Sequence, residues 1–168
     1  MLLDLRTILL TPGAEAPFST TLDLQDMAFG SCKPVSEPVR AEGAVRNTAG
    51  VLTMTGSVTT TLHGVCDRCT AEFVRDVEYP IDAVIVPKEE ADESENPWVF
   101  ELVDEDRADL DDIITTTFVL NMPSQLLCSP DCKGICFRCG RNLNLGPCDC
   151  KPEKDPRFAA LQQLLDKK

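Results

Sequence analysis

The first half of the chain alternates between apolar and polar positions in the way that β-strands do. Three segments rich in Val, Ile and Thr span residues 39–46, 51–62 and 73–86, and partial alternation within them predicts half-buried strands. Residues 47–50, with the sequence Asn-Thr-Ala-Gly, predict a hairpin turn between the first two strands. Residues 66–69 would form the next turn, which places them at the tip of a second hairpin.

Helical spacing replaces this alternation further along the chain. Residues 98–103 are predicted to be a short strand that returns to the sheet. Asp109 is a candidate N-cap, apolar residues follow it at helical spacing, and Pro123 ends the segment, which predicts a helix over about residues 109–121. Asp155-Pro156 predicts the start of a C-terminal helix.

These elements predict an α+β protein with an antiparallel β-sheet or open barrel-like body, two helices and a C-terminal cysteine-rich zinc-knuckle segment. The body would span residues 1–123 and the cysteine-rich tail residues 124–168. Residues 87–112 form an acidic loop region with 12 Asp/Glu against two Lys/Arg, and within it residues 89–97 are predicted to be a mobile, solvated loop. The alternative is that this loop attracts a basic partner such as a ribosomal protein.

The formal net charge of −12 is distributed unevenly along the 168 residues. Residues 1–127 hold 8 Lys/Arg and 23 Asp/Glu, whereas residues 128–168 hold 8 and 5. A body this acidic does not attract nucleic acid by its bulk charge, so only the tail is expected to contact RNA directly. Lys133, Arg138 and Arg141 are the nearest candidates; alternatively they are ordinary solvated charges around a metal knuckle. Aromatic residues, at 5%, are too few for a broad base-stacking surface.

Eight of the nine cysteines form four close pairs, and this pattern is typical of thiolate metal sites. A glycine follows the second cysteine of the third pair, where the turn of a metal knuckle often needs a positive φ. We expect the third and fourth pairs to form one site, and the first and second pairs to form another that clamps the tail to the body. The pairs are Cys66/Cys69, Cys128/Cys132, Cys136/Cys139 and Cys148/Cys150, and they would hold one or two zinc ions.

Other uses of the cysteines agree less well with the sequence. Disulfides are disfavoured because the N-terminal residues lack a secretory signal and no apolar run reaches the length of a membrane helix, which favours a cytoplasmic protein with reduced thiols. The spacing of Cys132, Cys136 and Cys139 matches that of radical enzymes with an iron–sulfur cluster, but such enzymes need a larger barrel. A thioredoxin-like role would need a βαβ context. His63 could replace one sulfur, and Cys32 is expected to be a spare thiol.

No catalytic constellation is recognisable. The sequence has no phosphate-binding glycine loop, and no Ser or Cys nucleophile with a second histidine. The abundant acidic residues lie in a run too polar to form a dry active site. We therefore expect a binding or scaffold protein, not an enzyme, and no small-molecule substrate.

Several motifs in the same order together resemble the YceD family. They are Cys66-Asp67-Arg68-Cys69, the helix from Asp109, Cys132-Lys133-Gly134-Ile135-Cys136, Cys139-Gly140-Arg141-Asn142 and Cys148-x-Cys150. The resemblance implies a cytoplasmic bacterial factor for large-subunit ribosomal RNA that acts by binding the RNA or a basic ribosomal protein, directly or indirectly. Candidate partner-binding residues are Lys133, Arg138, Arg141 and Asn142. The alternative is a zinc- or redox-responsive interaction module with an indirect effect on ribosomes.

Overall fold

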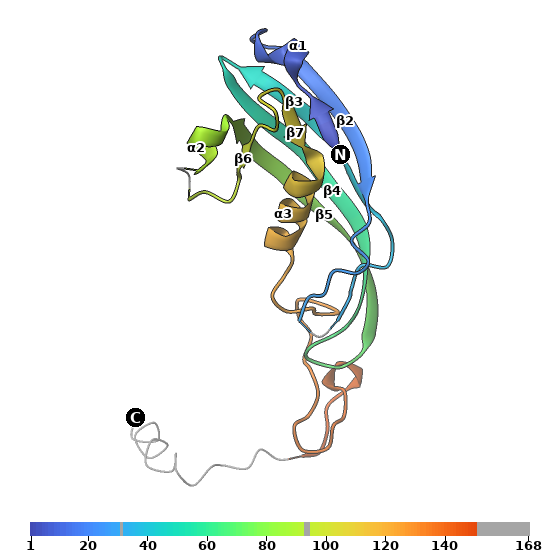
Figure 1. Cartoon of the computed structure of the whole chain (residues 1–168). Helices are drawn as coiled ribbons and strands as arrows, with labels where there is room; N and C mark the ends of the chain where they lie inside the picture. Colours follow the sequence, from blue (N-terminus) through green and yellow to red (C-terminus); the bar gives the residue numbers. More distant parts are fainter. Residues whose placement is uncertain (31, 93–94, 151–168) are drawn as a thin grey trace, which may run out of the picture.

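The computed structural model describes residues 1–30, 32–92 and 95–150 (Figure 1). No helix of these residues is long and apolar enough to cross a membrane. The elements in chain order are β1 (Leu2–Asp4), α1 (Arg6–Leu9), β2 (Glu15–Leu22), β3 (Val39–Thr48), β4 (Val51–Val65), β5 (Glu72–Val86), α2 (Lys88–Asp92), β6 (Val99–Glu101), β7 (Arg107–Asp109), α3 (Leu110–Asn121) and the 3-10 helix η1 (Leu143–Leu145).

The main sheet has the strand order β2-β3-β4-β5-β6 among the described residues. Its first three pairings are antiparallel, as predicted, whereas β6 pairs with β5 in parallel. The expectation of a purely antiparallel sheet is wrong at this edge, because the chain crosses over through α2 before β6 begins. The α+β class is confirmed, and the sheet is open, with β2 and β6 at its edges.

The β3–β4 turn shows how the hairpin predicted at residues 47–50 is fixed. Ala49 and Gly50 both have positive φ, 54° and 96°, as a tight two-residue hairpin requires. The buried Asn47 side chain accepts a hydrogen bond from the Gly50 N–H at 2.8 Å and donates to the carbonyls of Ile8 and Leu9 at 2.7 and 2.9 Å. Asn47 therefore ties α1 to the end of the sheet.

Helix α3 lies across one face of the sheet and covers the core (Figure 1). The Asp109 side chain accepts a hydrogen bond from the Asp111 N–H at 3.1 Å, which confirms the predicted N-cap. The helix ends before Pro123, since a residue that precedes proline disfavours helical ψ and Met122 has ψ 127°. Phe118 is fully buried, and the rings of Tyr79 and Phe29 each contact it edge-on at 5.8 Å between centroids.

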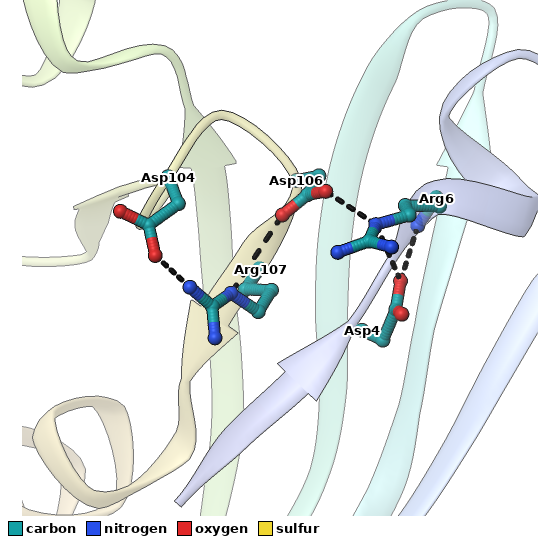
Figure 2. Close-up of polar contacts among 5 residues, drawn as sticks. All are labelled: Asp4, Arg6, Asp104, Asp106 and Arg107. Atoms are coloured by element: carbon teal, nitrogen blue, oxygen red, sulfur yellow. Dashed lines mark hydrogen bonds and ion pairs between the residues drawn. The ribbon is translucent and has the colours of Figure 1, made fainter.

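A separate ribbon of β1 and β7 leads into α3 and is held by alternating charges (Figure 2). The Asp106 carboxylate lies between Arg6 and Arg107, which also contact Asp4 and Asp104 respectively. These groups are partly exposed, and exposed ion pairs contribute little individually. The backbone pairing of Leu3 with Ala108 sets the register of these two three-residue strands, and the ion pairs lie beside it.

The acidic region at residues 87–112 is more ordered than predicted. Strand β6 lies within the strand predicted at residues 98–103 and α3 follows the predicted N-cap, whereas α2 occupies Lys88–Asp92, so the expectation of a mobile loop is wrong for those residues. Acidic residues in the first turn of α2, Glu89 and Glu90, interact favourably with the helix dipole, and Phe100 of β6 is buried in the core. The C-terminal helix expected from Pro156 lies outside the described residues.

Candidate metal centres

The structure gathers the eight paired cysteines into two groups. We call Cys66, Cys69, Cys128 and Cys132 the proximal group, and Cys136, Cys139, Cys148 and Cys150 the distal group. Within each group all four sulfur atoms lie within 4.8 Å of one another. These are the two sets that the sequence spacing predicts.

Both groups are built on a knuckle with the same backbone geometry. In the proximal knuckle, the Thr70 N–H donates to the Cys66 carbonyl at 2.9 Å, and the Cys66 N–H donates to the Ala71 carbonyl at 2.9 Å. In the distal knuckle, the Gly140 N–H donates to the Cys136 carbonyl at 2.8 Å, and the Cys136 N–H donates to the Arg141 carbonyl at 2.9 Å. Thr70 and Gly140 occupy equivalent positions, with φ of 57° and 70°. The positive φ predicted after the second cysteine is therefore present in both knuckles.

The two groups differ in where they lie. The proximal knuckle is the tip of the β4–β5 hairpin, and its sulfurs meet those of a segment 59 and 66 residues away. The distal group is formed entirely within residues 136–150, which extend beyond the end of the sheet remote from α1 (Figure 1). The proximal group therefore links the tail to the body, and the distal group orders only the tail.

The cysteines of the proximal group are also more deeply buried than those of the distal group. Cys66, Cys69 and Cys132 of the proximal group are 1%, 3% and 5% exposed, and Phe73 and Leu127 pack against them. In the distal group Cys136 is buried, but Cys139 is exposed. Solvent therefore reaches the distal thiols more readily than the proximal ones.

Hydrogen bonds reinforce the link between the hairpin and the tail. The Asp67 N–H donates to the Leu126 carbonyl at 2.8 Å, and the Leu126 N–H donates to the Asp67 carboxylate at 2.6 Å. The Ile135 N–H donates to the Arg68 carbonyl at 3.1 Å, and the Arg75 guanidinium donates to the Leu127 carbonyl at 2.6 Å. We call these four contacts the hairpin–tail seam.

The position of the Arg68 carbonyl also explains why residue 134 of the tail is a glycine. A Cβ atom on Gly134 would lie 3.0 Å from that oxygen, and Gly134 has a φ of +74°. A side chain at this position would therefore push the tail away from the hairpin and strain its backbone.

The thiols of each group have unequal proton affinities. Burial raises the pKa of Cys66, but backbone N–H groups of Cys128, Arg68 and Cys69 outweigh it and lower the pKa to about 6. Backbone N–H groups of Cys139 and Arg138 similarly lower the pKa of Cys136 to about 6.

Other thiols in the two groups shift in the opposite direction. Hydrogen bonding to the Cys69 sulfur raises the pKa of Cys128 to about 12, and hydrogen bonding to the Cys139 sulfur raises that of Cys150 to about 12. Each group therefore combines a thiol that ionises readily with one that holds its proton until a cation displaces it.

Asn144 contributes to the proximal group and was not predicted. Its side-chain amide donates to the Cys132 sulfur at 3.3 Å and lowers the pKa of that thiol, while its carbonyl oxygen accepts from the Lys133 N–H at 2.8 Å. Asn144 belongs to the loop between Cys139 and Cys148, so the distal loop supports the proximal group. The surrounding Asn-Leu-Asn-Leu-Gly run indicates a turn, and its first asparagine caps η1 by accepting from the Asn144 N–H at 2.9 Å, but the run does not indicate the contact with Cys132.

The predicted partner-binding residues all lie in this part of the tail. Lys133, Arg138 and Arg141 have exposed side chains. Asn142, which caps η1, is only partly exposed. His63 has an exposed side chain on β4 and belongs to neither group. The Cys32 thiol lies outside both groups and contacts the Phe29 carbonyl at 3.2 Å.

The sulfur geometry fits a tetrahedral ion better than disulfides. Contacts between the two halves of the proximal group are 3.7 Å for Cys66–Cys132 and 3.5 Å for Cys69–Cys128. A disulfide needs a separation of about 2.05 Å, whereas four thiolates about 2.3 Å from one ion lie about 3.8 Å apart. All nine cysteines are free thiols in this structure. The fold and the site thus define an α+β protein with two four-thiol groups positioned to hold metal ions.

The comparisons with known proteins place this class within one family. Residues 54–165 match the family described as "Large ribosomal RNA subunit accumulation protein YceD", and the chain belongs to this family. The match includes β5, α3 and all eight grouped cysteines. No solved structure matches the chain.

Individual relatives cover less of the chain. Proteins named as uncharacterized from Mycobacterium tuberculosis and Mycobacterium bovis are 34% identical over 118 residues, which is 69% of this chain and 56% of each relative. The chain therefore spans about half the length of these curated relatives. A chloroplastic YCED homolog 1 of Arabidopsis thaliana, named a large ribosomal RNA subunit accumulation protein, is 44% identical over 41 residues, 24% of this chain and 13% of that protein.

Proposed function

We propose that this protein is a non-catalytic cytoplasmic ribosome-biogenesis factor, which supports the synthesis, processing or stability of large-subunit ribosomal RNA and is stabilised by two zinc ions. The observation that carries the proposal is the family match over residues 54–165, which includes both four-thiol groups. The family description supports the ribosomal role, and the sulfur geometry supports the metal.

Zinc is the ion that these groups suit best. Four thiolates at tetrahedral spacing select zinc or an iron–sulfur centre, and a site with four protein ligands leaves no open position for a substrate or water. Such closed sites are structural, and in small modules they contribute about 10–16 kcal/mol to folding. The proximal zinc would hold the tail on the β4–β5 hairpin, and the distal zinc would hold the shape of the tail itself.

Two routes to the ribosomal RNA are compatible with the charges. The tail offers the exposed cations Lys133, Arg138 and Arg141 to the RNA itself. Strand β5 offers exposed carboxylates to a basic ribosomal protein, and such contacts weaken in high salt. These carboxylates are Glu72, Asp76, Glu78 and Asp82.

The test is depletion followed by complementation. Loss of the protein is expected to lower large-subunit ribosomal RNA relative to small-subunit RNA, and the wild-type chain is expected to restore the ratio. Cys69→Ser, which breaks the proximal group, should fail to restore it, whereas Cys32→Ser, which removes a thiol outside both groups, should succeed. An unchanged ratio of large-subunit to small-subunit RNA after depletion would refute the ribosomal role. Native mass spectrometry of the purified protein is expected to find two zinc ions per chain.

A second candidate is a zinc- or redox-responsive interaction module that affects ribosomes indirectly. The observation that favours it is the exposure of the distal thiol Cys139, because oxidation selects accessible thiols of thiolate character. This function predicts that mild peroxide changes partner binding while the thermal transition of the body stays constant. Binding that does not respond to peroxide or to removal of the distal zinc would exclude it.

A further inference from the structure

The distal knuckle carries an aromatic side chain that the fold does not use. Phe137 is 83% exposed, although burying a Phe side chain is worth about 1.5–3 kcal/mol. The equivalent residue of the proximal knuckle is Asp67, which belongs to the hairpin–tail seam. Two knuckles of the same geometry therefore use this position differently: Asp67 accepts a hydrogen bond from the tail, whereas Phe137 faces solvent.

The surroundings of Phe137 are cationic in an otherwise acidic chain. Residues 132–148 contain Lys133, Arg138 and Arg141 and no Asp or Glu, while the whole chain has a net charge of −12. Arg138 follows Phe137 directly, and the Arg141 carbonyl accepts the Cys136 N–H. The segment lies beyond the end of the sheet that is remote from α1 (Figure 1).

We infer that the distal knuckle is a binding site for single-stranded RNA, in which an unpaired base stacks on Phe137 and the neighbouring cations contact the phosphates on either side. A π-face that is held by a rigid turn and flanked by cations is suited to an unpaired nucleotide, since RNA proteins stack splayed-out bases on aromatic rings. The site is a single stacking position and not a broad platform. This inference rests on the proposed function and names the form of RNA that the tail contacts.

An apolar partner protein is the alternative occupant, and Leu145 provides the test that separates it from RNA. Leu145 is as exposed as Phe137, at 82%, and a protein that docks on exposed apolar groups would use both. A stacked base needs the aromatic ring alone. Leu145→Ala is therefore the matched control, because it removes an equally exposed apolar side chain from the same segment without removing a π-face.

The experiment measures the anisotropy of a fluorescein-labelled, unstructured 12-nucleotide RNA and of its duplex form with the full zinc-loaded chain. Phe137→Ala is expected to weaken single-strand binding about fivefold or more, the range for one stacked base. Phe137→Trp should bind as well as wild type or better, and Leu145→Ala should bind as wild type. The duplex should bind more weakly and respond little to Phe137→Ala.

Zinc content and the thermal transition are measured for each variant, so that a folding defect is recognised. Arg141→Gln should reduce the slope of log affinity against log salt by about 0.7. Equal single-strand binding by Phe137→Ala and wild type would overturn the inference, and so would an equal loss in Leu145→Ala, because RNA binding would then not depend on a π-face. Either result leaves the proposed function standing, because that function fails only if depletion leaves large-subunit ribosomal RNA unchanged.

Discussion

Removing one thiol from each group should have very different consequences for the body of the protein. In Cys69→Ser the tail should lose the proposed zinc link to the β4–β5 hairpin, and the hairpin–tail seam should open. In Cys139→Ser only the distal knuckle should lose its shape, because its four ligands lie within residues 136–150. Each variant removes a single sulfur, so each is the control for the other, and Cys32→Ser controls for thiol removal itself.

The difference can be worked out from chain separation. Cys69 and Cys128 are 59 positions apart, whereas Cys139 and Cys148 are nine positions apart. The entropy of loop closure scales as (3/2)RT ln n, so the proximal link restrains the unfolded chain by about 1.7 kcal/mol more than the distal one. At about 2–4 °C per kcal/mol for a chain of this size, Cys69→Ser should melt about 3–7 °C below Cys139→Ser.

Hydrogen exchange of the seam amides provides the structural readout. The amides of Asp67, Leu126 and Ile135 donate the hydrogen bonds that cross from hairpin to tail. They should be protected in the wild type and in Cys139→Ser and should exchange rapidly in Cys69→Ser. Persistent protection of these amides in Cys69→Ser, or loss of their protection in Cys139→Ser, would refute the conclusion that the proximal group links the tail to the body while the distal group orders only the tail.

Three further changes test the site locally. Thr70→Gly should raise the free energy of unfolding by about 0.5–1 kcal/mol, because a β-branched residue at φ 57° is strained; a urea titration that shows destabilisation would contradict this. Asp67→Ala should cost about 1–3 kcal/mol in the same assay, because it leaves the Leu126 N–H without its acceptor. Apparent zinc affinity should increase with pH, because the raised pKa of Cys128, about 12, means that zinc must displace a proton. Chelator competition at pH 6, 7 and 8 measures this, and a flat profile would contradict it.

The elements that could be predicted from the sequence are those in which a regular side-chain pattern continues over many residues. Strands β3, β4 and β5 contain 10, 15 and 15 residues, so their alternation was visible, and helix α3 has both a capping residue and a following proline. The grouping of the cysteines was also predictable, because short spacings leave few ways to aim four sulfurs at one point.

The unpredicted features are the eight-residue strand β2, several short elements and contacts between distant residues. Helices α1 and α2 contain four and five residues, too few for a helical period to emerge. The seam joins Asp67 to Leu126, and Asn144 reaches back to Cys132 across 12 positions. Neither contact leaves a local pattern, since Asp and Asn in a turn most often cap or bend their own backbone.

The two knuckles have the same backbone structure, and the residues in which they differ indicate that each knuckle has a different role. The backbone hydrogen bonds and the positive φ are the same in both, so these features serve the metal site itself. The first residue between the cysteines differs, Asp67 in one knuckle and Phe137 in the other, whereas the second is arginine in both. In the proximal knuckle Asp67 and Arg68 bind the protein's own tail, whereas in the distal knuckle Phe137 faces solvent. A knuckle already committed to the tail cannot also offer this surface to a partner, which makes the distal copy the one available for recognition.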